Sequence, residues 1–263
     1  MAAHCPLDFD ITRLRDAVRA MYTRVAETPD GEFHFHRGPE FAVDTLGYDP
    51  SELARVPSVA LSRFAGVGNP LAIGPIHAAE RVLDHACGAG TDLLLAAHKV
   101  GPSGRVIGVD MTAPMRAVAW QAAQQAGVAD RVEIRAGLFE ELPVDDSSID
   151  VVISNGVVNL SPDKRQVFRE IRRVLVPGGR LYLADVVLQR ELKLEARRDP
   201  DLWAACIGGA LPEAELFELA LEAGFAGGRI VERFDSFRHT TAENKVAKDL
   251  SLASVNFFAC KSA

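Results

Sequence analysis

A strand, a turn with two glycines and a helix are predicted in direct succession between residues 81 and 100, and this stretch constrains the fold more than any other. The apolar pair Val82-Leu83 comes first, Gly88 and Gly90 follow, and no glycine or proline interrupts residues 91–100. Glycine accepts positive φ and lets a ligand approach bare backbone. The amides at the start of the following helix attract negative groups. The stretch therefore predicts an α/β fold with a binding site at the turn.

A second predicted strand, over residues 105–110, ends in a carboxylate. Asp110 lies 20 residues beyond Gly90, about the distance at which doubly wound folds place an acid on ribose hydroxyls. The dinucleotide fingerprint would require a third glycine three residues after Gly90, where this chain has Leu93. The pattern thus predicts a ribose-containing ligand and disfavours a nicotinamide dinucleotide.

Apolar strands and helical stretches alternate from residue 81 to residue 187. Strands are predicted at 81–86, 105–110, 131–136, 149–154 and 179–187, and helices at 91–99, 113–126, 139–142 and 162–175. We expect Ser161 and Pro162 to begin the last of these helices. Apolar strands that alternate with helices predict a doubly wound parallel sheet, whose ligands bind beyond the carboxyl ends of the strands.

The remaining residues lie on either side of this alternating core, and the domain that contains the core is placed at 76–263. Residues 1–75 are predicted to form an N-terminal helical extension, with helices at 11–28 and 39–48 and from Pro50 onward. The chain after residue 187 is predicted to contain a helix at 212–223, a strand at 229–235, a polar helix near 241–250 and a final strand at 254–260.

Composition excludes several classes of function. The net charge of −7 argues against a nucleic-acid-binding surface. The amino-terminal residues do not resemble a signal peptide, and no apolar run is long enough to span a bilayer, so we expect a cytoplasmic protein without a membrane partner. The four cysteines are scattered, which predicts neither a zinc site nor a disulfide framework. No metal site is predicted.

Several motifs resemble those of S-adenosylmethionine (SAM) methyltransferases. The spacing Asp84-x-x-x-Gly88-x-Gly90, followed by the acid Asp110, is the first of them. Within that class the chain is similar to the arsenite methyltransferase family, close to the quinone C-methyltransferases, from about residue 39 to residue 235. Five segments carry this similarity. They are Gly-Val-Gly-Asn-Pro from Gly66, Val-Asp-Met-Thr from Val109, Ile-Ser-Asn-Gly-Val-Val-Asn-Leu-Ser-Pro-Asp-Lys from Ile153, Val-Leu-Val-Pro-Gly-Gly from Val174, and the stretch from Asp199-Pro200 through Cys-Ile-Gly-Gly-Ala-Leu.

The resemblance implies a Rossmann-like SAM-methyltransferase sheet, mostly parallel with an antiparallel last strand, and an N-terminal extension that covers it. It implies SAM as cofactor and S-adenosylhomocysteine as product. Residues 190–225 would form the substrate side. The cofactor residues it implies are Asp84, Ala86, Gly88 and Gly90 around the methionine part, Asp110 at the ribose, Met111, Thr112, Gly137, Leu138 and Glu140 around the adenine, and Ser154 and Asn155 beside the methyl group. For Glu140, an ordinary acid in the first turn of a helix is nearly as good an interpretation.

The chain departs from the family at the residues that bind arsenic. The family holds arsenic(III) with thiolates, because a soft metalloid prefers sulfur ligands. The three corresponding positions here are Val67, Gly156 and Cys206. We therefore expect a SAM-dependent methyltransferase that acts on another small molecule, as a monomer or a homodimer. The alternatives are a genuine arsenite methyltransferase that uses Cys206, and a non-catalytic SAM- or nucleotide-binding Rossmann protein.

Three residues are candidates for catalysis. Cys206 either lines the acceptor pocket or is a buried small hydrophobe. His34 and His36 either act as a general base or ligand or belong to a polar surface. Phe33, Phe35 and Phe41 are expected to pack within the N-terminal extension instead of forming a substrate cage.

Overall fold

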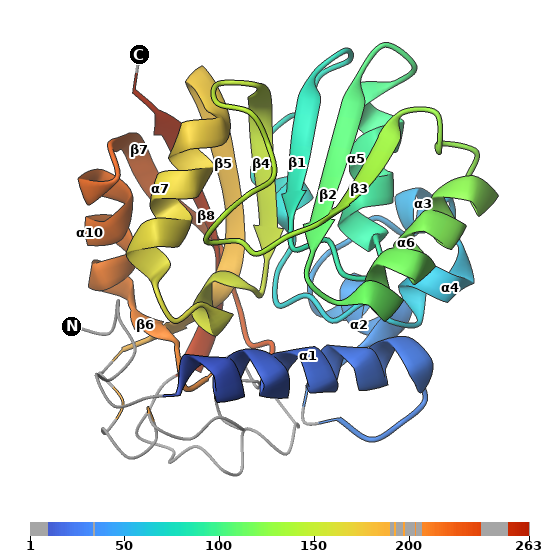
Figure 1. The fold of residues 1–263 in the computed structure, drawn as a ribbon, viewed down its shortest axis with the longest axis horizontal. Coiled ribbons are helices and arrows are strands. Elements are labelled where there is room, and N and C mark those ends of the chain that lie inside the picture. Colours follow the sequence, from blue (N-terminus) through green and yellow to red (C-terminus); the bar gives the residue numbers. More distant parts are fainter. Residues whose placement is uncertain are drawn as a thin grey trace.

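In the computed structural model, residues 10–33, 35–189, 192, 197, 203, 207–237 and 252–262 are described, and a mixed sheet lies at the centre (Figure 1). The strand order is β3-β2-β1-β4-β5-β8-β7, and the short β6 pairs with β5. The strands are β1 (Arg81–His85), β2 (Arg105–Asp110), β3 (Val132–Ala136), β4 (Ile149–Asn155), β5 (Leu175–Leu188), β6 (Leu211–Pro212), β7 (Phe225–Phe234) and β8 (Leu252–Lys261).

The direction of the strands confirms the predicted fold class. Strands β1 to β5 pair in parallel, and β8 is antiparallel to both β5 and β7. The carboxyl ends of β1, β2 and β4 therefore meet at one edge of the sheet. Asp84, Asp110 and Asn155 lie at that edge, where ligands bind in doubly wound sheets.

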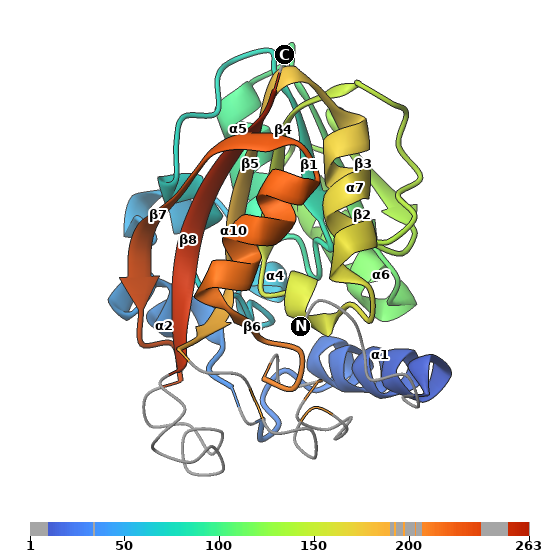
Figure 2. The same ribbon diagram turned by 90° about the vertical axis from the view of Figure 1, so that its left-hand side faces the viewer.

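Helices cover both faces of the sheet (Figure 2). Helices α5 (Thr91–Val100) and α6 (Ala113–Gln125) contribute to the apolar cluster on one face, and α7 (Lys164–Val174) and α10 (Glu213–Glu222) to the cluster on the other. The shorter elements are α2 (Gly38–Asp44), α3 (Pro50–Leu53), α4 (Ser58–Leu61) and the 3₁₀ turns η1 (Pro70–Ala72) and η2 (Val158–Leu160).

Helix α1 (Ile11–Glu27) runs across the carboxyl ends of the strands (Figure 1). Asp10 caps it by accepting a hydrogen bond from the Arg13 N–H at 3.0 Å. The buried side chains of Leu14 and Val18 face the core. The helix predicted at 11–28 is thus confirmed, and it lies over the edge where the ligand site is expected.

The helix predicted at 139–142 is wrong. These residues form a loop with one isolated bridge, between Leu138 and Glu141. The Leu142 N–H donates to the Glu170 carboxylate at 2.8 Å, and Arg173 donates to the Leu142 carbonyl at 3.0 Å. Side chains of α7 therefore satisfy this backbone, and a single turn is too short to nucleate a helix alone.

Other boundaries also differ from those predicted. Helix α7 begins at Lys164 and is capped by Asp163, which accepts from the Gln166 N–H at 3.0 Å. The Ser161 hydroxyl, the predicted cap, donates to Glu140 at 2.8 Å instead. Strand β5 begins four residues before 179, and β7 begins four residues before 229. The helix predicted at 241–250 lies outside the described residues.

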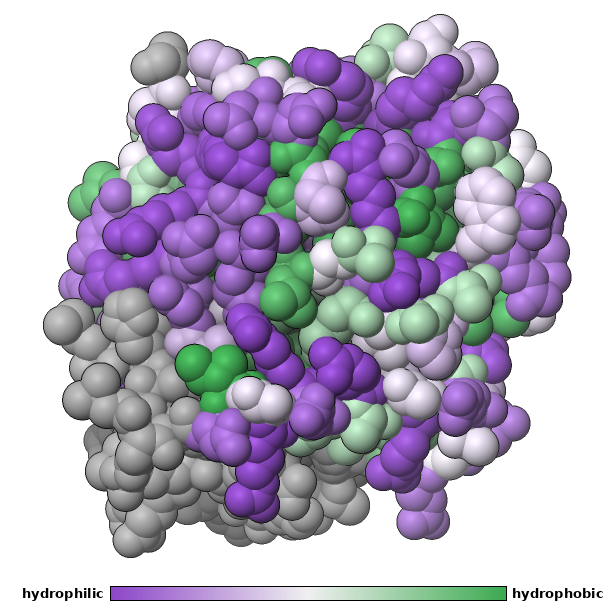
Figure 3. Space-filling model, viewed as in Figure 1, coloured by the Kyte–Doolittle hydropathy of each residue, from purple (hydrophilic) through white to green (hydrophobic). Residues whose placement is uncertain are grey.

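Apolar residues fill both layers of the core. The side chains of Leu93 and Leu94 in α5 are fully buried. Hydrophilic residues cover most of the face in Figure 3, and the apolar ones appear there in small separate groups. Among the described residues, no helix is both long enough and apolar enough to cross a membrane.

The buried side of α5 predicts a large effect of one substitution. We expect Leu94→Ala to lower the free energy of unfolding by about 2–5 kcal/mol, because it leaves a cavity at a fully buried position. Leu221→Ala on α10 is the matched control, because that leucine is 73% exposed. Urea denaturation of both variants measures the difference, and equal losses would contradict the packing described.

Candidate functional site

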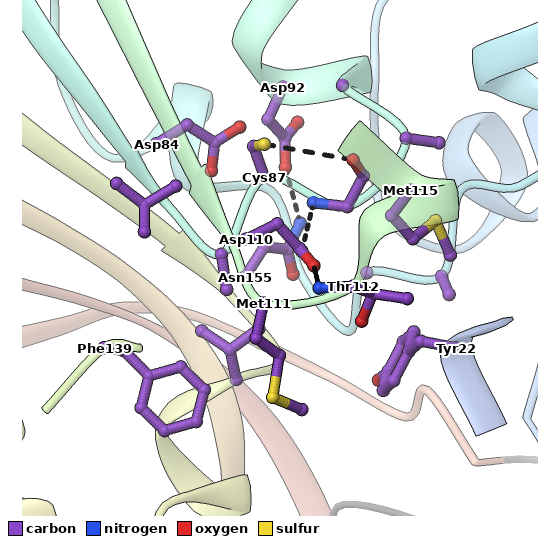
Figure 4. Close-up of a pocket in the computed structure, with 18 of the residues that line it drawn as sticks. Tyr22, Asp84, Cys87, Asp92, Asp110, Met111, Thr112, Met115, Phe139 and Asn155 are labelled. Atoms are coloured by element: carbon purple, nitrogen blue, oxygen red, sulfur yellow. Dashed lines mark hydrogen bonds between the residues drawn. The ribbon is translucent and has the colours of Figure 1, made fainter. Parts of the chain in front are cut away.

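A pocket opens at the carboxyl edge of the sheet, beneath α1 (Figure 4). Its empty space, including the open mouth, is about 880 Å³. The turn after β1, the ends of β2 and β4, helix α1 and the loop over residues 63–66 all contribute to its wall.

The glycine turn presents bare backbone to this pocket. Gly88 and Gly90 have φ values of +51° and +95°, in the region that favours glycine. A Cβ at Gly88 would meet no atom within 4 Å, so the backbone there borders open space. The Ala86 φ is also positive, at +70°. The backbone of Ala86 thus has an unfavourable conformation, and it lies in the turn whose main-chain atoms face the pocket.

Asp110 connects two turns at the pocket floor. Its carboxylate accepts hydrogen bonds from the Gly88 N–H at 2.9 Å and the Thr112 N–H at 2.7 Å. Burial raises the pKa of Asp110, and the same two hydrogen bonds act against that rise. Each carboxylate oxygen has a second lone pair, so Asp110 can also accept from two ligand hydroxyls.

Two further buried carboxylates line the same pocket. Burial raises the pKa of Asp84 well above its usual range, and the charges of Asp92 and Asp110 raise it further. The Asp84 Oδ2 atom is buried with no hydrogen-bond partner in the described structure. Burial also raises the pKa of Asp92 to about 6. A positively charged ligand group would relieve this crowding of acids.

Asn155 links the sheet to the loop that precedes β1. Its Oδ1 atom accepts from the N–H groups of Val67 at 2.9 Å and Gly68 at 3.2 Å. Its Nδ2 atom donates to Asp92 at 2.9 Å and to the Gly68 carbonyl at 3.0 Å. The Tyr48 hydroxyl donates to the other Asp92 oxygen at 2.6 Å. One amide thus holds β4, α5 and the loop together at the pocket wall.

The opposite part of the pocket is apolar. Met111 and Phe139 lie on one side of the view in Figure 4, and Asp84 and Asp92 lie on the other. Tyr22 of α1 closes a third side. Such a wall suits a flat, uncharged ring.

Most of the predicted cofactor residues meet in this pocket. Those that line it are Asp84, Ala86, Gly88, Gly90, Asp110, Met111, Thr112, Gly137, Leu138 and Asn155. Ser154 and Glu140 do not: the fully buried Ser154 hydroxyl lies 3.3 Å from the His85 ring, and Glu140 accepts from Ser161. His36 lines a smaller adjoining pocket. His34 and Cys206 lie outside the described residues.

Sequence reasoning missed several residues that the fold brings to the site. Tyr22 and Tyr48 come from segments far from the glycine turn, and no motif identifies them. Asp92 follows the turn closely, but an acid in the first turn of a helix is common and predicts no role. Cys87 also lines the pocket, and burial raises the pKa of its thiol well above the usual range, which keeps it protonated.

His85 occupies the last position of β1 but cannot act as a charged group. Its side chain is fully buried, and burial lowers its pKa to about 4. The ring is therefore neutral near pH 7, which suits its place between Ser154 and the Phe139 carbonyl. Within the described residues, no group of three or more histidines, cysteines or acids is arranged to hold a metal ion.

Together these features define the ligand that the pocket can hold. The glycine turn supplies amides, Asp110 can accept from a pair of hydroxyls, and the apolar wall can cover a flat base. The unpaired oxygen of Asp84 and the neighbouring Asp92 favour a cation. A nucleoside that carries positive charge on its side chain fits all of these groups.

Comparisons with known proteins agree with this geometry. The family described as "Methyltransferase domain" matches residues 76–240. An arsenite methyltransferase from Halobacterium salinarum is 42% identical over 193 residues, which are 73% of this chain and 49% of the relative. A demethylmenaquinone methyltransferase from Lactiplantibacillus plantarum is 46% identical over 109 residues, which are 40% of this chain and 46% of the relative. The chain thus spans about half the length of these relatives.

The comparison with solved structures gives the same result. The crystal structure of an arsenic(III) S-adenosylmethionine methyltransferase from Chlamydomonas reinhardtii superposes with a TM-score of 0.73 and 32% identity. The match covers 86% of this chain and 75% of that chain. The fold is therefore shared with a protein of that class.

The raised pKa of Asp92 predicts how stability depends on pH. In the unfolded chain the Asp92 carboxyl loses its proton near pH 4, whereas in the folded protein it keeps the proton up to about pH 6. The folded state is therefore most favoured at low pH, and it loses stability as the pH rises through about 6. Without ligand, we expect Asp92 to lower the free energy of unfolding by about 1 kcal/mol between about pH 5 and about pH 7. Urea denaturation of Asp92→Asn at both pH values should show a decrease in the free energy of unfolding that is smaller by this amount. Asp130→Asn, at an exposed acid, serves as control. An unchanged decrease in Asp92→Asn would contradict the assignment.

Proposed function

The chain belongs to the methyltransferase domain family, and we propose that it is a SAM-dependent methyltransferase whose acceptor is a small molecule other than arsenite. The observation that carries this proposal is the contact between Val67 and Gly156. A Cβ at Gly156 would lie 3.3 Å from the Val67 Cγ1 atom, so two of the three positions implied for arsenic-binding thiols are neighbours in space. Neither residue carries sulfur.

The loss of these thiols removes the chemistry that arsenite needs. A soft metalloid is held by several thiolates, and Cys206 alone supplies one. The space next to Gly156 is instead bordered by the methyl groups of Val67. An acceptor that touches this wall makes apolar contacts, which favours a molecule with an uncharged surface.

The pocket residues fit SAM residue by residue. Asp84 and Asp92 would hold the ammonium of the methionine part, and Asp110 would accept from the ribose hydroxyls. Met111 and Leu138 would cover the adenine. When bound, SAM supplies a methyl group on a positively charged sulfur. The chain has to align the acceptor with that group and exclude water.

We assign supporting roles to the two predicted residues that do not line the pocket. Ser154 orients the neutral His85 ring, which lies behind the adenine wall beside Phe139 at 5.7 Å between ring centroids. Glu140 lies 3.7 Å from the Arg15 guanidinium and accepts from Ser161, so it connects α1 to the start of α7. Each residue would act on the cofactor through its neighbours.

Residues 1–75 would serve as a lid over the cofactor. Val18 and Tyr22 of α1 and the loop over residues 63–66 line the pocket, while the family match begins at residue 76. A wall built from residues outside the matched domain can exclude water without altering the glycine turn. The histidines His34 and His36 of this lid, and Cys206 of the segment 190–225, would lie on the acceptor side.

Asp110 should be the most sensitive single position for SAM binding. We expect Asp110→Ala to weaken binding by about 10- to 100-fold, because a buried carboxylate that accepts from two hydroxyls and two amides is lost. Isothermal titration calorimetry with SAM measures this change. Asp44→Ala, at an exposed acid on α2, is the matched control. Unchanged affinity in Asp110→Ala would remove Asp110 from the ribose site.

Turnover with arsenite tests the proposed acceptor. We expect the purified protein to bind SAM and S-adenosylhomocysteine but to form no methylated arsenic. We expect Cys206→Ser to leave SAM affinity unchanged, because the residue belongs to the acceptor side. Arsenite methylation that Cys206→Ser abolishes would overturn the proposal. Loss of SAM binding in this variant would show that Cys206 lies at the cofactor.

A further inference from the structure

Two buried acids of the cofactor pocket receive different numbers of hydrogen bonds. One oxygen of Asp92 accepts from the Tyr48 hydroxyl at 2.6 Å, and the other accepts from the Asn155 Nδ2 atom at 2.9 Å. The Oδ2 atom of Asp84 is buried and accepts from no group in the described structure. Hydrogen bonds to a carboxylate favour its charged form. Asp92 therefore holds a negative charge more readily than Asp84.

Among the described residues that line the pocket, no cation pairs with these two acids. Asp84 and Asp92 lie on the same side of the pocket in Figure 4, and the charges of Asp92 and Asp110 both raise the pKa of Asp84. Arg63 is the one cationic residue in the described lining, and its guanidinium donates to carbonyl groups of the N-terminal extension. Arg116 donates to the Asp110 carbonyl at 2.8 Å. A second negative charge, on Asp84, is therefore unfavourable.

The other titratable side chains beside the pair leave this imbalance unchanged. Burial raises the pKa of the Cys87 thiol well above its usual range, and it lowers the pKa of His85 to about 4, so both are uncharged near pH 7. Tyr22 of α1 adds a phenol to the lining. A cation that the ligand brings is therefore the group that can balance both acids.

Tyr48 reaches Asp92 from outside the matched domain. It belongs to the N-terminal extension, whereas the family match begins at residue 76. Burial and the charge of Asp92 raise the pKa of Tyr48 well above its usual range, so the hydroxyl keeps the hydrogen that it donates. The Asn155 Nδ2 atom donates to this hydroxyl at 3.2 Å, and the ring packs edge-on against Phe64 at 5.2 Å between centroids. The phenol is thus held in place as a donor to Asp92.

We propose that Asp84 releases one proton when the ammonium of the methionine part binds, and that Tyr48 is the positioning residue that keeps Asp92 charged for the same ammonium. The inference rests on the proposed function, because it takes the cofactor to be SAM. Without ligand, the pair carries one negative charge, on Asp92. With the ammonium in place, the O–H bond of the Asp84 carboxyl breaks, its electron pair stays on the carboxylate, and the solvent takes the proton. Because protons compete with the ammonium, the affinity rises with pH.

Calorimetry of the full chain counts this proton without turnover. S-Adenosylhomocysteine is titrated near pH 7 in phosphate and in Tris, whose ionisation enthalpies differ, and we expect release of about one proton per ligand. The matched ligand is 5′-methylthioadenosine, which lacks the amino-acid part, and we expect it to release almost none. No release with S-adenosylhomocysteine, or equal release with both ligands, would overturn the inference. Absence of S-adenosylhomocysteine binding would instead signal failure of the proposed function.

The variant Asp84→Asn assigns the proton to one acid. We expect it to abolish the proton release and to weaken S-adenosylhomocysteine binding by about tenfold or more, because a charge next to the ammonium is lost. The affinity for 5′-methylthioadenosine should change little. Proton release that persists at the level of the unmodified chain would show that Asp84 is not its source.

The variant Tyr48→Phe tests the positioning role. Loss of the donor makes Asp92 keep its own proton to higher pH, so we expect the release near pH 7 to rise from about one proton toward two. We expect binding of S-adenosylhomocysteine to weaken about 5- to 10-fold, and that of 5′-methylthioadenosine to change little.

Tyr182→Phe is the matched control for this variant. Tyr182 is also buried, and its hydroxyl donates to the Pro75 carbonyl at 2.9 Å, away from the described lining of the pocket. We expect it to leave both affinities and the proton release unchanged. If Tyr48→Phe weakens both ligands equally and leaves the proton release at about one, Tyr48 has a merely structural role and the inference fails.

Discussion

The site depends on one carboxylate that is shared between two neighbouring strand ends. Asp110 ends β2, yet its oxygens bond the backbone of the turn after β1 and of the turn that begins α6. Parallel pairing places the two strands in register, with His85 opposite Val109. The positive φ of Gly88 and Gly90 then positions main-chain amides around open space. Without this carboxylate both turns lose their anchor, and the pocket loses its floor.

The side-chain amide of Asn155 performs the corresponding task for the N-terminal extension. Asn155 satisfies two backbone N–H groups of the loop before β1 and also meets Asp92 at the start of α5. Residues of that loop line both the large pocket and the smaller adjoining pocket. A displacement of about 1 Å at this amide would therefore disturb the walls of both pockets together.

Local chemistry explains which features could be predicted from the sequence. The sheet and the pocket floor could be predicted because they depend on the periodicity of apolar residues and on the spacing of a few motifs. These motifs are the succession of strand, turn and helix, the glycine pair, and the acid after the second strand. The short helix at 139–142 was wrong because its backbone is satisfied by Glu170 and Arg173, which are distant in sequence. The contact of Tyr48 with Asp92, and that of Val67 with Gly156, arise from tertiary packing alone. No periodicity reveals such pairs.

Strand β8 has a consequence for the order of synthesis. It lies between β5 and β7, although β7 precedes it in the chain. Until the ribosome has made the residues up to Lys261, the hydrogen-bonding edge of β5 is open and β7 has no neighbour in the described sheet. The nascent protein thus has an unpaired strand edge at β5. The side chains of Val255 and Phe257 are also missing from its core. Nascent chains that pause in this interval would be exposed to wrong strand pairing.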